Sequence, residues 1–217
     1  MIYKSTRGNT TEVGFKEVTL KGLAEDGGLF IPQKWENINF KYDKKEIIFE
    51  EIAVEILKCF IDESINENTL KEIVYNSYKH FSHKDITPIN EIAKNHWILE
   101  LFHGPTLAFK DIALQLLGNL FDYYLKKENR ELTIIGATSG DTGSAAINAV
   151  RYNKNIKIFI LHPYNRVSNF QRRQMTTVKS KNVFNIAVKG NFDDCQNLVK
   201  SMFSDKNFSN QINMSGV

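Results

Sequence analysis

From residue 97 onward, short apolar runs alternate with longer runs whose apolar residues have helical spacing. The short runs have the length of buried strands. The apolar runs occupy residues 97–102, 132–137, 156–161 and 183–188, and the helical runs occupy residues 110–127, 141–152, 168–177 and 192–204. Strands and helices that alternate in this way form a parallel sheet with flanking helices, because right-handed crossovers place the strands side by side. The sequence therefore predicts an α/β fold that binds ligands at the carboxyl ends of its strands.

The first part of the chain has a different pattern, in which helices dominate. A short helix is expected over residues 15–22, where a glycine ends it, and a short strand over residues 29–31. Apolar residues at helical spacing predict amphipathic helices over residues 47–61 and 69–81. We expect these helices to pack a small domain rather than to bind a ligand.

The expected domain boundary lies between these two patterns. Residues 82–95 contain Pro88 and several polar side chains, so we place the boundary in this segment. This gives a mainly helical N-terminal domain over residues 1–85. Residues 86–217 then form the first part of the α/β domain.

The composition excludes several functional classes. The chain of 217 residues is 42% hydrophobic and 24% charged, with a net charge of +3, which is ordinary for a globular protein. Nucleic-acid binding has little support, because no basic cluster is interleaved with aromatic residues. No apolar run approaches the length of a membrane span, and the polar first residues are no signal peptide. Cys59 and Cys195 lack metal-ligand spacing and indicate reduced thiols in a cytoplasmic protein.

The segment between the first expected strand and its helix contains a candidate nucleophile. In Phe102-His-Gly-Pro-Thr-Leu-Ala-Phe-Lys-Asp111, a glycine and a proline favour a turn, so Lys110 lies at the entry to the helix. Apolar neighbours at a positive helix end disfavour an ammonium, lower the pKa of a lysine and favour the neutral amine that a Schiff base needs. On local sequence alone, the favoured interpretation is instead a surface lysine paired with Asp111.

A second polar loop follows the next expected strand. Ser139-Gly-Asp-Thr-Gly143 lies between a β-rich run and a helix. Glycines let the backbone approach a ligand closely, and the first amides of a helix can bind an anion. The alternative is an ordinary capped turn, with Ser139 or Asp141 as the N-cap. The loop lacks the spacing of a dinucleotide fingerprint and the Gly-Lys-Ser/Thr of a phosphate loop, which disfavours a nucleotide-binding module.

Together, the two loops resemble those of the threonine synthase family. These are pyridoxal-phosphate enzymes of the fold type that includes the β subunit of tryptophan synthase. The similar motifs extend along the whole chain and include Tyr3-Lys-Ser-Thr-Arg-Gly8, Leu23-Ala-Glu-Asp-Gly-Gly-Leu-Phe-Ile-Pro32, Leu161-His-Pro-Tyr164, Gln174-Met-Thr-Thr177 and Val188-Lys-Gly-Asn-Phe-Asp-Asp-Cys-Gln196. The resemblance is specific because several motifs occur in the same order. It implies a threonine synthase N-terminal domain followed by part of a pyridoxal-phosphate-dependent catalytic domain.

The resemblance also implies a reaction and a site. Lys110 would hold pyridoxal 5′-phosphate as an internal aldimine (a Schiff base) and, once freed, would act as the base. The substrate would be O-phospho-L-homoserine, which loses phosphate from Cγ and gains water at Cβ to give L-threonine. Asp141, at a position that is asparagine in many relatives of this fold, would contact the cofactor. The residues expected to bind the substrate are Ser139, Gly140, Thr142 and Gly143.

Other polar residues have simpler explanations. His103 is favoured as a hydrogen-bonding loop residue rather than a base, because Lys110 already fills that role. Arg166, Arg172 and Arg173 cluster before a helix and could meet a phosphate, but surface charges are the favoured interpretation.

The resemblance covers only the first part of the family's length. Threonine synthases continue past the position of Val217 into segments that hold the substrate phosphate, the cofactor phosphate and the pyridine nitrogen. The chain is therefore expected to be an N-terminal half of a lyase that is catalytic when complete. The alternative is a non-catalytic fragment or pseudoenzyme that acts as a binding or complementing half through an exposed sheet edge.

Overall fold

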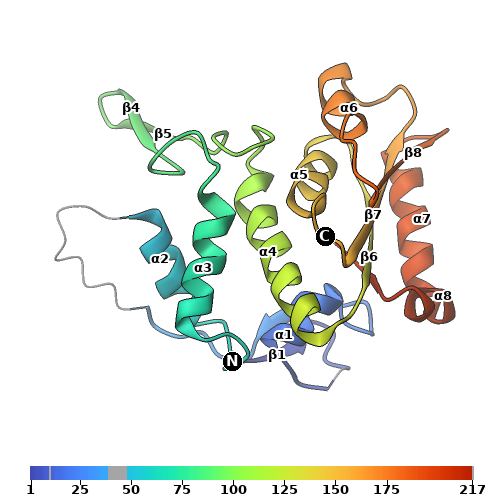
Figure 1. Cartoon of the computed structure of the whole chain (residues 1–217), viewed down its shortest axis with the longest axis horizontal. Coiled ribbons are helices and arrows are strands. Elements are labelled where there is room, and N and C mark those ends of the chain that lie inside the picture. The colour runs from blue at the N-terminus through green and yellow to red at the C-terminus, as the bar shows by residue number, and fades with distance from the viewer. Residues whose placement is uncertain (10, 39–47, 217) are drawn as a thin grey trace. The chain divides into compact units, whose positions relative to one another are not determined.

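The computed structural model describes residues 1–9, 11–38 and 48–216. The chain divides into two compact units, residues 1–104 and 105–217, and each is described by itself (Figure 1). The domain boundary expected between residues 85 and 86 falls inside the first unit. The amide of Ser82 donates to the carbonyl of His103 (2.8 Å), which joins the segment after residue 85 to the residues before it.

The first unit opens with a small antiparallel sheet. Strand β1 (Ile2–Ser5) pairs with β2 (Val13–Gly14) on one side and with β3 (Phe30–Pro32) on the other. Helix α1 (Phe15–Lys21) follows β2 and ends at Gly22, whose positive φ of 71° suits glycine. The short helix and the strand expected here are confirmed. The sheet adds strands to a region that was expected to be mainly helical.

Two longer helices complete most of the first unit. Helix α2 (Phe49–Lys58) lies within the predicted amphipathic run, whose residue 47 is outside the described residues. Helix α3 (Glu67–Tyr78) begins where the side chain of Asn66 accepts from the amide of Thr69 at 2.9 Å. Its buried side chains follow the predicted spacing and include Leu70, Ile73, Val74 and Tyr78. Both predicted helices are confirmed.

The strand predicted over residues 97–102 was wrong in both its partner and its burial. Strand β5 (His96–Leu99) pairs antiparallel with β4 (Ile89–Ala93) in a hairpin and has no place in the parallel sheet. Its side chains are exposed, with Trp97 60% accessible. Asn95, at a φ of 61°, makes the tight turn. A short apolar run is equally compatible with a hairpin, because periodicity alone does not identify the partner strand.

The second unit contains a parallel sheet in the order β8-β7-β6-β9 (Figure 1). Its strands are β6 (Leu132–Ala137), β7 (Ile156–Pro163), β8 (Val183–Val188) and the short β9 (Met214–Ser215). All three pairings are parallel, with Ile134 opposite Ile158 and Ile160 opposite Asn185. The predicted α/β class, a parallel sheet with flanking helices, is confirmed.

Helices cover both faces of this sheet. Helix α5 (Asp141–Val150) lies on one face and packs against α4 (Lys110–Glu128), while α7 (Phe192–Ser204) and the short α8 (Lys206–Gln211) lie on the other (Figure 1). Helix α6 (Asn169–Thr176) follows β7 and packs against α5. The α7 face of the core contains Ile135, Leu161 and Cys195. Within the described residues, no helix is both long and apolar enough to cross a bilayer.

Candidate functional site

Lys110 is the first residue of α4, at the end of a tight turn. The turn contains Leu107 at a φ of 63°, a left-handed conformation that is uncommon for leucine. The Lys110 side chain is half-buried, and its Nζ lies 5.0 Å from the centre of the Phe109 ring. Within the described part of the chain, no carboxylate lies within ion-pair distance of this amine. Lys110 therefore presents an amine that no structural ion pair occupies.

Asp111, the next residue, is more deeply buried than Lys110. It is fully buried, and its carboxylate accepts from the Thr106 amide (2.7 Å), the Thr106 hydroxyl (2.9 Å) and Gln115 Nε2 (3.3 Å). Burial raises the pKa of this carboxyl above its ordinary value, while the hydrogen bonds from Thr106 and Gln115 oppose that shift. The interpretation of Lys110 as a lysine paired with Asp111 was wrong, because Asp111 is used to close the turn.

The loop Ser139–Gly143 lies at the carboxyl end of β6, at the start of α5. The hydroxyl of the buried Thr138 accepts from the amides of Gly140 (3.0 Å) and Gly143 (2.9 Å). The N-cap residue is Gly140, and no side chain at that position caps the helix. The alternative of a turn capped by Ser139 or Asp141 was therefore wrong. The amides of Gly140 and Gly143, both expected to bind substrate, are satisfied inside the protein.

Three other amides of the loop remain available. The amides of Ser139, Asp141 and Thr142 have no hydrogen-bond acceptor in the described residues. For Asp141 and Thr142 this is the usual state of the first amides of a helix, which lack partners four residues back. Ser139 and Asp141 are exposed, and Thr142 is half-buried. The loop thus offers free donors at a positive helix end, an arrangement that suits an anion.

Helix α6 contacts both of these segments. Gln171 Nε2 donates to Asp141 Oδ1 in the glycine loop (2.6 Å), and Gln174 Nε2 donates to the carbonyl of Thr106 in the lysine turn (2.8 Å). No hydrogen bond or ion pair joins Lys110 directly to residues 139–143 in the described structure. The two segments are linked instead through α6. Sequence analysis missed both glutamines, although Gln174 begins one of the motifs that carry the resemblance.

The remaining polar residues keep modest roles. His103, in the first unit, pairs through Nε2 with Glu100 Oε2 at 2.6 Å, in keeping with a hydrogen-bonding loop residue. Arg166 and Arg173 are exposed. Cys59 and Cys195 are free thiols. The described residues contain no cluster of histidine, cysteine and carboxylate side chains that could hold a metal ion.

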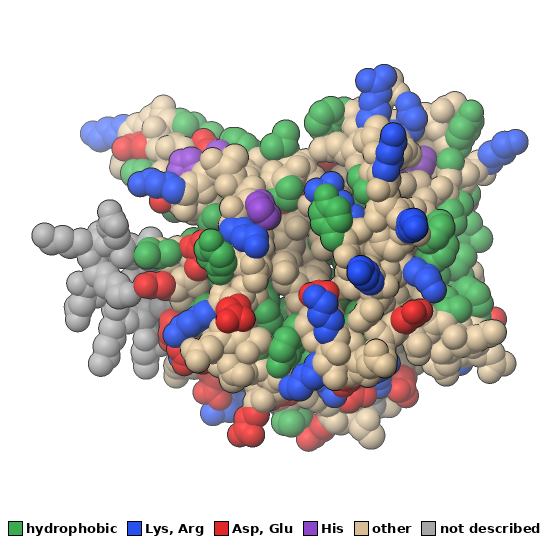
Figure 2. Space-filling view, in the orientation of Figure 1, with side chains coloured by type: hydrophobic (Ala, Val, Ile, Leu, Met, Phe, Trp, Pro, Cys, Tyr) green, Lys and Arg blue, Asp and Glu red, His purple; other side chains and the backbone are tan. Residues whose placement is uncertain are grey.

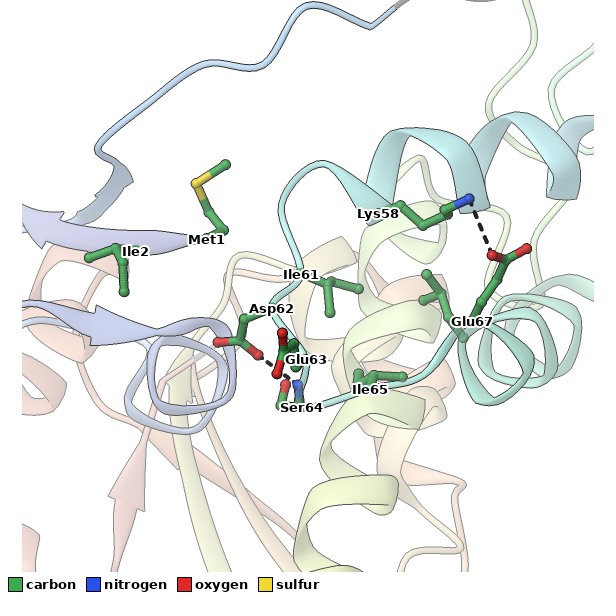
Figure 3. A pocket seen from close by; sticks show the side chains of 10 residues that line it. Met1, Ile2, Lys58, Ile61, Asp62, Glu63, Ser64, Ile65 and Glu67 are labelled. Carbon is green, nitrogen blue, oxygen red and sulfur yellow. Dashed lines mark hydrogen bonds and ion pairs between the residues drawn. The ribbon is translucent and has the colours of Figure 1, made fainter.

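A separate hollow of about 700 Å³ lies in the first unit, between β1 and the α2–α3 connection (Figure 3). Three of its charged side chains have partners within the protein. Lys58 pairs with Glu67 at 3.3 Å, and Asp62 accepts from the amides of Phe15 (2.7 Å) and Ser64 (3.0 Å). The one lysine that lines this pocket is therefore paired, unlike Lys110 in the second unit.

The comparisons with known proteins agree on one group of enzymes. The family model described as "Threonine synthase N terminus" matches residues 2–78. Threonine synthase of Pseudomonas aeruginosa is 49% identical over 214 residues, which cover 96% of this chain and 45% of that protein. The enzyme named threonine synthase in Saccharomyces cerevisiae is 42% identical and is covered over 45% of its length by the whole of this chain.

Solved structures give the same result. The structure of pyridoxal-phosphate-bound threonine synthase from Brucella melitensis superposes with a TM-score of 0.90 at 44% identity, over 100% of this chain and 47% of that one. The yeast threonine synthase structure gives a TM-score of 0.89 at 41% identity, over 99% and 45% of the two chains. The chain thus spans less than half the length of the relatives that it matches.

Proposed function

The chain is homologous over its whole length to the N-terminal part of threonine synthases, and on this premise we propose that it supplies part of a threonine synthase active site. The complete enzyme would convert O-phospho-L-homoserine and water to L-threonine and phosphate. The reaction would take place in the cytoplasm on a small-molecule substrate. The observation that carries the proposal is the unpaired amine of Lys110, held at a helix start by a neighbouring carboxylate that faces inward.

The residues present fit pyridoxal 5′-phosphate as the cofactor. Attachment through a lysine requires an amine free of ion pairs, and Lys110 meets this requirement among the described residues. When bound, pyridoxal phosphate supplies the electron sink that stabilises negative charge on the substrate carbon. The relative from Brucella melitensis was solved with this cofactor bound. Lys110 would hold it, and the exposed carboxylate of Asp141 would contact it.

The chain's own groups would then bind the substrate and move protons. The free amides of Ser139, Asp141 and Thr142 would donate hydrogen bonds to the substrate α-carboxylate, because hydrogen bonds to an ionised acceptor are the stronger kind. Thr138 would keep the loop in shape through the amides of Gly140 and Gly143. The amine of Lys110 would take the proton from substrate Cα and return it further along the carbon chain. Lys110 is thus proposed as the catalytic base.

A second candidate is a non-catalytic half that binds a complementing partner. The edge strand β8 favours it, because Phe184 (41%) and Ile186 (43%) remain exposed there. The two candidates differ in what they require of Lys110. Only the first requires a reactive amine.

The test treats the full 217-residue chain with pyridoxal phosphate, reduces it with borohydride and maps the label by mass spectrometry. Lys126 is the matched control, since it lies on the same helix but pairs with Asp122 at 2.6 Å. We expect Lys110 to be labelled well above Lys126. Equal labelling would contradict the cofactor proposal. Threonine release after adding the remaining segment of a relative would distinguish a lyase half from a non-catalytic one.

A further inference from the structure

Two glutamines on one face of α6 each reach one of the two loops of the proposed site. Gln171 and Gln174 are three residues apart, so their side chains project from the same side of the helix. Backbone contacts at both ends of α6 do not involve the side-chain donor of either glutamine. Ser168 caps the helix by accepting from the amide of Gln171 (3.2 Å), and Asn185 Nδ2 donates to the carbonyl of Met175 (3.2 Å) at its other end.

The side chain of Gln171 lies directly over the glycine loop. Its Nε2 donates to Asp141 Oδ1 at 2.6 Å, while its Oε1 accepts from the Ser168 hydroxyl at 2.8 Å. Gly140 has a φ of 150°, and a Cβ built there would lie 2.6 Å from Gln171 Nε2. The amide group of Gln171 therefore occupies the space that a side chain at residue 140 would take. Gln171 thus packs against Gly140 and hydrogen-bonds the carboxylate of Asp141.

Gln174 reaches the turn that carries the lysine. Its Nε2 donates to the carbonyl of Thr106 at 2.8 Å. The same Thr106 binds the inward-facing Asp111 through its amide and its hydroxyl. Lys110 lies between Thr106 and Asp111 in the chain, so Gln174 contacts the turn that carries the amine. A single helix thus holds the lysine turn and the glycine loop at once.

We propose that Gln171 and Gln174 are positioning residues, through which α6 sets the placement of the Lys110 turn relative to the loop Ser139–Gly143. The chemical consequence rests on the proposed function, in which the amine and the free amides act on one substrate. The positioning of the two loops by Gln171 and Gln174 does not rest on the proposed function, since it concerns only contacts within this chain. The two parts can therefore fail separately.

The test replaces each glutamine donor with a group whose donor ability depends on pH. In Gln171→Glu, a carboxylate meets Asp141, which is the one titratable side chain among the described partners of Gln171. In Gln174→Glu, a carboxylate meets the Thr106 carbonyl. Neither can donate when ionised, but a protonated carboxyl can. Gln196→Glu on α7 makes the same chemical change away from both loops and is the control.

The readout is amide NMR of the full chain between neutral and acid pH. At neutral pH we expect Gln171→Glu to shift the resonances of residues 139–143 and to reduce the exchange protection of the Gly143 amide about tenfold. Gln174→Glu should shift Thr106 and Asp111 instead. Both changes should reverse as the new carboxyl takes up its proton, and Gln196→Glu should produce neither. A merely space-filling role would give no such pH-dependent recovery.

Two results would overturn the proposal. One is loop and turn resonances that match the parent at neutral pH in both variants. The other is a disturbance that persists unchanged at acid pH. Borohydride labelling of Lys110 in the parent is scored independently. Shifted loops without labelling would refute the cofactor proposal alone, and labelling with unshifted loops would refute the positioning proposal alone.

Discussion

At the scale of single residues, Lys110 and Asp111 are neighbours in sequence but have opposite environments. Asp111 is buried and bonded to Thr106, whereas the Lys110 amine has no carboxylate partner in the described structure. The two positions should therefore respond differently to substitution. A change at 111 should affect stability, and a change at 110 should affect chemistry.

In the completed enzyme, Lys110→Ala should abolish threonine formation and leave the fold intact. Alanine is the better helix former, so the change at the helix start costs little stability. The chemistry loses both its attachment point and its proton carrier, and positioned acid–base groups alone contribute about 10²–10⁴-fold. Lys110→Arg should fail as well, because a guanidinium stays charged. The measurement is threonine release, with circular dichroism as the control for folding. Turnover near that of the parent would refute the assignment.

Asp111→Asn should destabilise the second unit. Asparagine keeps one acceptor oxygen, so the buried amide or hydroxyl of Thr106 loses its partner at a cost of about 1–3 kcal/mol. The raised pKa of Asp111 means that folding favours its protonated form. The stabilisation that protonated Asp111 gives the folded state is fully present below the ordinary pKa of an aspartate. It is lost as pH rises through the raised pKa. The deficit of the variant, measured by urea unfolding at several pH values, should therefore be larger at acid pH. A deficit independent of pH would contradict this.

At the scale of elements, α4 and α5 approach closely at one glycine. A Cβ built on Gly118 would lie 2.7 Å from the carbonyl oxygen of Ala149 and 3.0 Å from its Cβ. The obstacle is backbone, which cannot turn aside as a flexible side chain could. The contact joins the middle of α4 to the last turn of α5.

Gly118→Ala should therefore destabilise the protein by about 1–3 kcal/mol, as overpacking does. This is opposite in sign to helix propensity, which favours alanine over glycine by about 1 kcal/mol. The exposed Ala113 on the same helix offers a control, because Ala113→Gly should cost only that propensity. Thermal unfolding of the three proteins measures the difference. A more stable Gly118→Ala would show that the helices can separate without cost.

At the scale of the whole second unit, the α7 side of the sheet is incompletely covered. Figure 2 shows apolar side chains along the right-hand margin, over β8 and α7. A hollow of about 510 Å³ lies beneath α7 and α8, lined by apolar residues that include Phe159, Ile186, Met202 and Phe208. Its rim carries the pair Lys157–Glu131 at 3.3 Å. Edge strands with exposed apolar side chains favour pairing with other chains.

Ile186→Lys should reduce concentration-dependent association of the chain, because a charge on an edge strand opposes pairing. Tyr75→Lys is the control, since Tyr75 is 60% exposed but lies on α3 in the first unit, outside the strand β8. Light scattering across a range of concentrations makes the comparison. If the control reduced association as much as Ile186→Lys, general charge rather than the edge would be responsible.

The sequence by itself determined the local elements of this protein. Strands β6 and β8 and helix α7 have the predicted bounds, because hydrophobic period and capping act over a few residues. The α/β class followed from the alternation of these elements. The candidate residues Lys110 and Ser139–Gly143 were found from turn chemistry and motif order, which are also local in the chain.

Only the tertiary structure decided which segments meet. Residues 96–99 lie in an exposed hairpin, and Asp111 is buried in the core. The amides of Gly140 and Gly143 donate to the hydroxyl of Thr138. The tertiary structure also joined Gln171 to Asp141, thirty positions away, and Gln174 to Thr106, sixty-eight positions away. The physical reason is that a hydrogen bond depends on the distance between two groups in space. Local periodicity sets how each element forms, whereas packing of all the elements sets which donor reaches which acceptor.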